Sequence, residues 1–303
     1  MSAAQDVSQL GVSAVAGRRR KKNRFAAFAR SQPLGMISLM IIVALVVVAV
    51  IGPTIAPYDP AAPEFDRLLG PSGSNWFGTD ELGRDIFSRT LYGARVSILV
   101  GFGATAISIS CACLIGLVSG YFGGWVDTII QRVVDGVIAF PTLVLLMALV
   151  VITGSGIPQL ILILGFLGSA GTSRVVRSAV LVVRQQQYIE AARSVGVPTP
   201  RILLLHVLPN CFAPIMVSAT VGLGGVILAE AALSFLGVGI NDPSQPTWGQ
   251  MLNRAQRFVN VEPMQALWPG AAIALAVFSF NMLGDALRDL LDPRLRGARG
   301  NFG

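Results

Sequence analysis

Long runs of apolar residues dominate the chain, and short stretches rich in charge, proline or glycine separate them. A helix needs roughly 20 apolar residues to cross a bilayer core about 30 Å thick. Six runs meet this requirement, and they cover residues 35–56, 96–120, 135–153, 157–175, 212–238 and 266–286. Only Thr153-Gly154-Ser155-Gly156 separates the third run from the fourth, which indicates a tight turn between antiparallel helices. The pattern predicts an all-α membrane protein with six transmembrane helices.

Composition places the chain in a bilayer rather than in a soluble class. Of its 303 residues, 53% are hydrophobic and 13% are charged, and the mean hydropathy is +0.66. The charged fraction is about half the roughly 25% usual in soluble domains. The first apolar run, Leu34 to Ala56, exceeds the roughly 7–15-residue core of a signal peptide and precedes no A-x-A cleavage motif. We expect this run to remain as a membrane anchor.

The distribution of basic residues predicts the orientation. The formal net charge is +7, and a basic block between Arg18 and Arg24 directly precedes the first apolar run. With both termini inside, 17 of the 23 Lys and Arg residues fall in cytoplasmic segments, as the positive-inside rule requires. A basic block in this place is typical of a membrane flank and argues against a nucleic-acid partner. We expect a multi-pass protein of the plasma (inner) membrane with both termini cytoplasmic.

The runs and their charges divide the chain into a tail and a membrane domain. Residues 1–30 are predicted to form a basic, disordered cytoplasmic tail, and residues 31–303 the six-helix domain. Within that domain we expect outer loops at 57–95 and 239–265 and a cytoplasmic loop at 176–210.

The first outer loop is predicted to contain a short helix on the membrane surface. Thr79 suits the cap of such a helix, because Asp80 and Glu81 would then lie in its first turn. Leu82 and Ile86, four residues apart, would share one face. The helix would lead into the second span.

Missing residues exclude several kinds of chemistry. No G-x-x-x-x-G-K-[ST] motif occurs, and the only lysines, Lys21 and Lys22, lie in the basic tail, so the chain cannot form a P-loop. His206 is the only histidine and lies in a cytoplasmic stretch without an obvious nucleophile. The three cysteines lie in or beside apolar runs, as buried small hydrophobes do. We expect no catalysis, no metal site and no cofactor in this chain.

The cytoplasmic loop carries the most informative pattern. Four residues recur at i, i+3, i+4 and i+7 and would form one apolar face of a short helix: Tyr188, Ala191, Ala192 and Val195. Gly196 suits the left-handed position that ends a helix, and Pro198 prevents continuation. Thr199 then suits the cap of a second helix that ends near Leu208-Pro209. The first helix could enter a partner's groove, with Glu190 paired to a basic residue there, or it could pack on its own protein.

Six residues of this loop resemble the EAA motif of the permease subunits of ABC importers. They follow the spacing of that family: Glu190, Ala191, Ala192, Gly196, Leu208 and Pro209. His206 stands where most members have an aliphatic residue, a departure that is common in the peptide branch. The resemblance implies a type I ABC importer permease fold. It also implies a coupling helix, including Tyr188 and Arg193, that docks into a cytoplasmic ATPase subunit.

A segment before the second apolar run narrows the resemblance. It is similar to the C-type permeases for dipeptides, oligopeptides and nickel through nine residues: Phe77, Gly78, Thr79, Asp80, Gly83, Arg84, Asp85, Ser88 and Arg89. Runs 229–237 and 283–294 resemble the same branch, so the resemblance covers about residues 30–296.

This resemblance implies a set of partners. They are a second homologous permease, two cytoplasmic P-loop ATPase subunits that would hold ATP and Mg²⁺, and an extracytoplasmic substrate-binding protein. The chain itself would transport without hydrolysing ATP. Di- and oligopeptides are the expected cargo, and nickel chelates or another small solute remain open.

Three polar residues within the last two spans are candidates for the translocation path: Glu230, Ser234 and Asn281. Because an isolated acid in a span is costly, Glu230 either lines the path or pairs with an arginine such as Arg254. Asn281 either shapes a gate or is solvated at a helix end. The alternative class, a self-sufficient secondary carrier, would need coupling ionisable residues in its spans, and Glu230 is the one plausible candidate.

Overall fold

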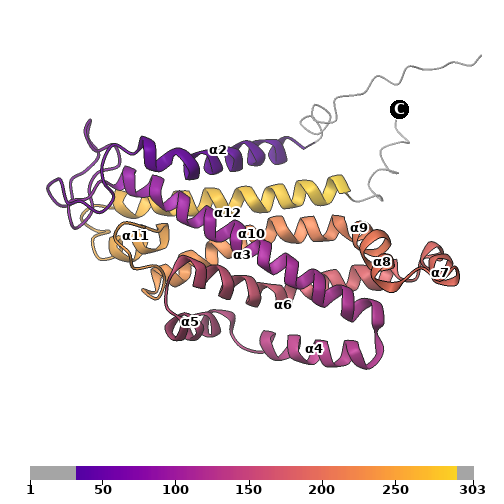
Figure 1. Ribbon diagram of the computed structural model, residues 1–303. Helices are drawn as coiled ribbons and strands as arrows, with labels where there is room; N and C mark the ends of the chain where they lie inside the picture. The colour runs from indigo at the N-terminus through magenta and orange to yellow at the C-terminus, as the bar shows by residue number, and fades with distance from the viewer. Residues whose placement is uncertain (1–31, 292–303) are drawn as a thin grey trace, which may run out of the picture.

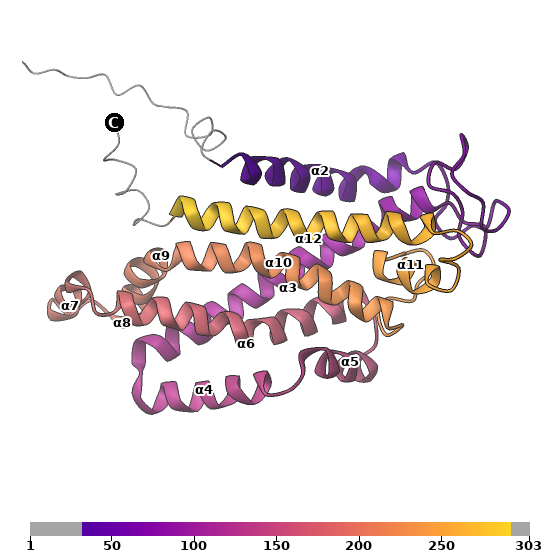
Figure 2. The same cartoon turned by 180° about the vertical axis from the view of Figure 1, so that it is seen from behind.

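The computed structural model describes residues 32–291, whose regular structure is helical, in a bundle of roughly side-by-side helices (Figures 1 and 2). Expectations for the tail before residue 32 and for the chain after residue 291 lie outside these described residues. The helices are α2 (Pro33–Ile55), α3 (Ile86–Phe122), α4 (Gly124–Ile138), α5 (Thr142–Thr153), α6 (Ile157–Val183), α7 (Gln187–Ser194), α8 (Thr199–Ile202), a π-helical turn (Leu203–Val207), α9 (Leu208–Asn210), α10 (Phe212–Phe235), α11 (Trp248–Ala255) and α12 (Met264–Leu291).

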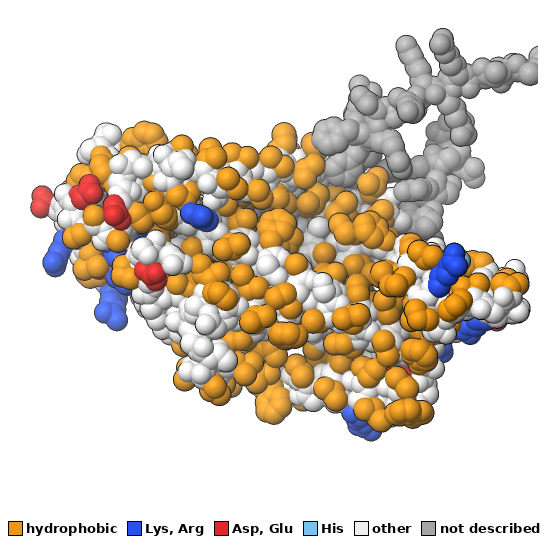
Figure 3. Space-filling model, in the orientation of Figure 1, with side chains coloured by type: hydrophobic (Ala, Val, Ile, Leu, Met, Phe, Trp, Pro, Cys, Tyr) orange, Lys and Arg blue, Asp and Glu red, His pale blue; other side chains and the backbone are white. Residues whose placement is uncertain are grey.

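The helices confirm the predicted all-α membrane fold. Within residues 32–291, five helices are each long and apolar enough to cross a membrane: α2, α3, α6, α10 and α12. Helices α4 and α5 pass the same test only as a pair, and together they bring the number of possible spans to six. Figure 3 shows hydrophobic side chains over the middle of the bundle, while most visible charged side chains lie towards its two ends.

The third apolar run, 135–153, is not the single straight helix that was expected. It contains the end of α4 and all of α5, which are bent by 85° relative to each other. Pro141 explains the break, because proline donates no backbone hydrogen bond and disfavours helical geometry at Phe140 before it. Hydropathy missed the start of α4 at Gly124 because this helix mixes apolar residues with polar ones such as Asp127.

The prediction of a surface helix capped by Thr79 is also wrong. Helix α3 begins at Ile86 and continues without interruption for 37 residues into the second span. Its cap is Asp85, whose carboxylate accepts a hydrogen bond from the Ser88 backbone N–H at 2.7 Å. Gly83, with φ at 81°, holds a left-handed turn before the cap, and Leu82 lies in that turn and not on a helix face.

Close packing between α3 and α6 forms the centre of the bundle. A side chain at Gly116 would begin 2.7 Å from the Val176 Cβ and 2.9 Å from the Arg177 backbone N. One turn later, a side chain at Gly120 would begin 2.9 Å from the Val180 Cβ. Glycine at both positions lets the two backbones approach, as in small-xxx-small packing of membrane helices.

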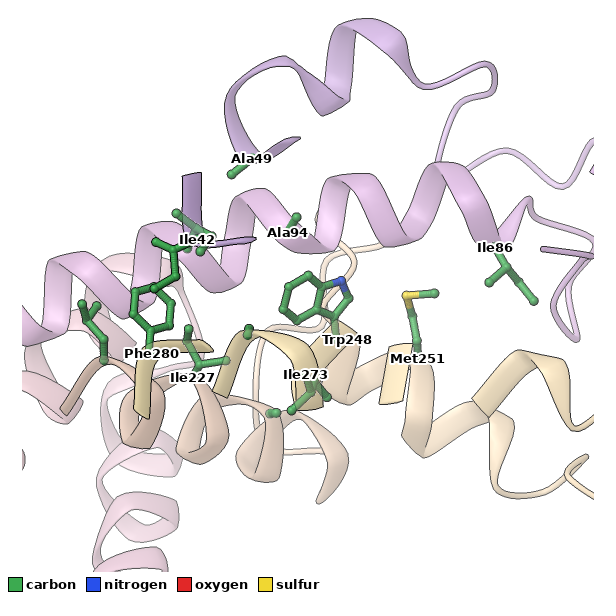
Figure 4. Packing of buried hydrophobic residues seen from close by; sticks show 13 residues of the cluster. Ile42, Ala49, Ile86, Ala94, Ile227, Trp248, Met251, Ile273 and Phe280 are labelled. Carbon is green, nitrogen blue, oxygen red and sulfur yellow. The ribbon is translucent and has the colours of Figure 1, made fainter. Parts of the chain in front are cut away.

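A second cluster of buried apolar side chains joins α2, α3, α10, α11 and α12. Figure 4 shows Trp248 of α11 among apolar side chains that include Ile42, Ile227 and Phe280, from α2, α10 and α12. The Trp248 indole is almost fully buried and donates its Nε1–H to the Thr90 carbonyl of α3 at 3.0 Å. The segment after α10 is thereby attached to the start of α3.

Replacement of Gly116 by alanine tests the α3–α6 contact. We expect the added methyl group to destabilise the fold by about 1–3 kcal/mol through overpacking, seen as a lower melting temperature of the purified protein in detergent. Gly136→Ala is the matched control, because no atom lies within 4 Å of the position its methyl would take. Equal melting temperatures for the two variants would contradict the close contact.

Candidate functional site

Helix α7 projects beyond the end of the bundle (Figures 1 and 2). Its buried side consists of Ile189 and Ala192, which pack into an apolar cluster with Val183, Ile202 and Val207. Ile189 is fully buried, so it anchors the helix. The opposite side of α7 is left open.

The predicted apolar face of this helix is mostly on the open side. Tyr188 is 44% exposed, Val195 is 79% exposed, and Ala191 is also exposed, whereas only Ala192 of the predicted four is buried. The periodicity identified the helix and an apolar face that is mostly exposed, but it did not identify Ile189 as the residue that reaches the core. The Glu190 carboxylate is exposed and makes no ion pair within the described part of the chain.

Gly196 ends α7 in the left-handed conformation that its sequence position predicted, with φ at 78°. The Val197 N–H donates to the Ala192 carbonyl at 3.0 Å, and the Gly196 N–H donates to the Arg193 carbonyl at 2.9 Å. These two bonds form a Schellman motif, and Val197 makes the apolar contact that usually accompanies it. The tight end turns the chain directly towards α8.

After this turn, a nearly continuous helical path leads from α8 to the long helix α10. Thr199 is the first residue of α8 and makes no capping bond with its side chain, contrary to the prediction; the carbonyl of Pro198 accepts the first backbone bonds instead. The π-helical turn follows, and its Leu203 carbonyl accepts from the Leu208 N–H. Pro209, which has no N–H, lies directly after this turn.

A cavity lies between α6 and α10, with a volume of about 670 Å³. Most of its lining residues are small or apolar, and Arg288 is the only charged one: Gly168, Gly171, Thr172, Val175, Ala213, Pro214, Val217, Ser218, Val221, Gly222, Arg288 and Leu291. A smaller cavity of about 220 Å³ shares four of these residues and reaches Thr105 and Ser108 of α3. Together they form one groove, which we call the α6–α10 groove; its lining is mostly small and apolar, with a few hydroxyl groups.

The predicted path residues do not line this groove. Glu230 is fully buried, and its carboxylate accepts hydrogen bonds from the hydroxyls of Ser234 at 2.8 Å and Ser97 at 3.3 Å. It does not pair with Arg254, which instead contacts Glu81 at 3.2 Å. The expected pair with Arg254 is therefore wrong, and the carboxylate is bonded by hydroxyl groups instead.

Asn281 takes no part in the hydrogen bonds of the Glu230 carboxylate. Its amide donates to the Val277 carbonyl of its own helix at 3.0 Å and faces Gly224 of α10. Thr172 and Ser218 of the groove were not predicted from the sequence. Their signal is the spacing of four residues to another groove residue, Gly168 on α6 and Gly222 on α10, which places each pair on one helix face.

The nine-residue motif in the segment between α2 and the first turn of α3 folds around one buried carboxylate. Asp80 accepts from the backbone N–H groups of Leu82 and Arg84 at 2.9 and 3.0 Å. It also accepts from the Arg84 Nε–H at 2.7 Å and lies 3.6 Å from the Arg89 Nε. The Arg89 guanidinium, which is almost fully buried, donates in addition to the Pro60 carbonyl. This network closes the loop over the start of α3.

The other residues of the motif complete this fold of the loop. The Thr79 hydroxyl donates to the Asp66 carbonyl at 2.7 Å, and the Asp85 carboxylate accepts from Ser88. Gly78 and Gly83 both have positive φ, and Phe77 stacks on Trp268 of α12 with ring centroids 3.9 Å apart. None of the nine lines the α6–α10 groove, so the structure gives them an architectural position.

Among residues 32–291, no group of three or more His, Cys, Asp or Glu side chains is placed to hold a metal ion.

Comparisons with known proteins show which family these features belong to. A family described as binding-protein-dependent transport system inner membrane component matches residues 112–297. A second, described as the N-terminal TM domain of oligopeptide transport permease C, matches residues 25–71. The chain is 41% identical over 269 residues to the dipeptide transport system permease protein of Alkalihalophilus pseudofirmus, with 88% of each chain covered. It is 43% identical over 270 residues to the glutathione transport system permease protein of Escherichia coli O6:K15:H31, covering 88% of this chain and 89% of the relative.

Replacement of Asp80 by asparagine tests the network in the outer loop. We expect the fold to lose about 3–5 kcal/mol, because Arg84 and Arg89 would stay buried without their main counter-charge. The measurement is the melting temperature in detergent, with Glu64→Gln, an exposed acid in the same loop, as the control. If the Asp80→Asn protein had the same melting temperature as the control, the buried arginines would not need the Asp80 carboxylate as a partner.

Proposed function

The chain belongs to the family of inner membrane components of binding-protein-dependent transport systems, and from this membership we propose that it is one of two permease subunits of an importer for peptides or peptide-like solutes. A second, homologous permease would cover the α6–α10 groove and complete the path. Two P-loop ATPase subunits would bind ATP and Mg²⁺ and supply the hydrolysis that this chain does not perform. An extracytoplasmic binding protein would deliver the cargo to the outer loops.

The observation that carries this proposal is the open side of α7. Its exposed residues Tyr188, Ala191 and Val195 are apolar or small, and Glu190 beside them is free of internal ion pairs in the described chain. Such a short, projecting helix with small residues suits a groove on an ATPase subunit. We place this end of the bundle in the cytoplasm, where the basic residues of segment 174–201 also belong.

The backbone route from α7 to α10 indicates how closure of the ATPases would reach the path. Residues 199–235 are helical apart from the turn at Cys211, and only the tight turn 195–198 separates them from α7, so a displacement of α7 would be passed to a stiff segment. Helix α10 lines one wall of the α6–α10 groove. A shift of this wall against α6 would alternate access between the two sides of the membrane.

The lining of the groove supports a peptide-like cargo. Hydroxyls at Thr105, Ser108, Thr172 and Ser218 offer donors and acceptors for peptide groups, while the glycines leave room for varied side chains. The similar proteins named above are permeases for dipeptides and for glutathione. A self-sufficient carrier has less support, because Glu230, its candidate coupling residue, is buried outside the groove.

Gly196→Asp tests the coupling role of the loop. We expect normal membrane insertion together with loss of the ATPase subunits or with ATP hydrolysis that no longer drives uptake. The reason is that a left-handed non-glycine residue costs about 1–2 kcal/mol and the carboxylate adds charge at the docking end. The measurements are co-purification of the ATPase subunits and uptake by the complete importer in proteoliposomes.

Gly237→Asp is the matched control for this variant. Gly237 also has positive φ, also has no neighbouring atom within 4 Å of a side chain, and ends α10 with the same pair of backbone bonds. It should retain coupling. Normal uptake by the Gly196→Asp importer would remove the loop from the coupling mechanism.

Ser218→Trp tests the path. The indole would fill the α6–α10 groove, and we expect uptake to be lost while the ATPase subunits still co-purify. Val182→Trp places the same side chain on the exposed surface of α6 outside the groove and should transport normally. Full uptake by Ser218→Trp would mean that cargo passes elsewhere.

A further inference from the structure

Arg193 attaches α7 to the last turn of α3. Its guanidinium lies over the Tyr121 ring, with 4.7 Å between the Cζ atom and the ring centroid, and its Nε–H donates to the Tyr121 hydroxyl at 3.1 Å. Both a cation–π contact and a hydrogen bond therefore join the same two side chains. In the described chain this is the one side-chain hydrogen bond from α7 to another helix.

Tyr121 stands at a corner where three helices meet. It belongs to the last turn of α3, directly before Gly123 and Gly124, whose positive φ values reverse the chain into α4. Arg184, at the end of α6, donates to the carbonyls of Gly120 and Tyr121 at 2.8 and 3.3 Å. This cation satisfies the free carbonyls at the end of α3 and holds it against α6.

The start of α4 is joined to the same corner by charge. Asp127 in its first turn accepts a hydrogen bond from the Ser119 hydroxyl of α3 and forms an ion pair with Arg177 of α6. Gln131, one turn later, donates to the Ser119 hydroxyl at 2.9 Å. The ends of α3, α4 and α6 therefore form one polar-bonded unit, which we call the α3–α4–α6 corner.

We propose that Tyr121 is a positioning residue that passes movements of α7 to the α3–α4–α6 corner through Arg193. This inference rests on the proposed coupling role of the loop and adds a second route to it. The first route runs along the backbone from α7 through α8 and α9 to α10. The second crosses space to α3, which borders the smaller cavity through Thr105 and Ser108, and to the bent pair α4–α5. Both walls of the groove would then respond to one displacement of α7.

The chemistry of the contact suits this role. A guanidinium stacked on an aromatic ring and bonded to its hydroxyl resists sliding in two directions, because either movement breaks one of the two contacts. Ile189 and Ala192 hold α7 only by apolar packing, which has no directional preference. Arg193 and Tyr121 thus define the register of α7 on the bundle.

The test compares Tyr121→Phe, Tyr121→Leu and Arg193→Gln in the complete importer reconstituted in proteoliposomes, with ATP hydrolysed per substrate molecule imported as the readout. We expect this ratio to rise by roughly 3- to 10-fold in Tyr121→Leu and in Arg193→Gln. The rise should be smaller in Tyr121→Phe, which keeps the ring and loses the hydroxyl. The ATPase subunits should co-purify with the Tyr121→Phe and Tyr121→Leu variants, because these leave every residue of α7 unchanged.

Tyr92→Phe is the matched control. It removes a tyrosine hydroxyl from the same helix at its opposite end, where the hydroxyl contacts the Pro53 carbonyl at 3.4 Å, and it should leave the ratio unchanged. The double variant Tyr121→Leu/Arg193→Gln should raise the ratio no further than either single variant does, since the two substitutions remove the same interaction.

Three results would overturn the proposal: an unchanged ratio in Arg193→Gln, additive effects in the double variant, or loss of the ATPase subunits from Tyr121→Leu. If the Tyr121→Leu protein does not fold, Arg193→Gln and Tyr121→Phe decide the question on their own. The result of this test can be distinguished from the result of the Gly196→Asp test. A Gly196→Asp importer that couples normally would reject the coupling role of α7, whereas a failure confined to the Tyr121 and Arg193 variants rejects only the second route.

Discussion

The contact between the backbones of α3 and α6 holds the rest of the molecule in place. It exists because Gly116 and Gly120 carry no side chains where Val176 and Val180 approach. Helix α3 carries the outer-loop network at its start and the Tyr121 contact at its end. Helix α6 supplies one wall of the groove and leads directly into α7. The separation between α7 and the groove is therefore defined by how these two helices pack.

Most of the spans could be predicted from the sequence because a bilayer imposes a simple rule on composition. The spans α2, α6, α10 and α12 could be predicted because each contains a run of apolar residues long enough to cross the bilayer. The start of α4 was not predicted by this rule. Its polar residues, such as Asp127, bond to α3 and α6 and lower the mean hydropathy of the helix. The rule also failed at the start of α3, because the side chains that arrange residues 77–85 find their partners at Pro60 and Asp66, far back in the outer loop.

The candidate site shows the same limit at the level of single side chains. Gly196 could be predicted because a helix end with a left-handed residue is a local event. The buried face of α7 could not be located to within one residue, since Ile189 is selected by a cluster that includes distant Val183 and Ile202. The bonds of Glu230 are likewise invisible in the sequence, because Ser97 lies 133 positions away. Local geometry is encoded locally, whereas the partner of a buried polar group is a property of the whole fold.

The length of α3 has a consequence for the surrounding lipid. Its apolar part, residues 96–120, extends over about 37 Å at 1.5 Å per residue, compared with a hydrocarbon core of about 30 Å. A free helix would relieve this mismatch by tilting. Here the polar network around Asp80 holds one end, and the ion pair between Asp127 and Arg177 holds the other. Contacts within the protein therefore define the oblique path of α3 across the bundle (Figures 1 and 2), and this tilt reduces the bilayer thickness that its long apolar run requires.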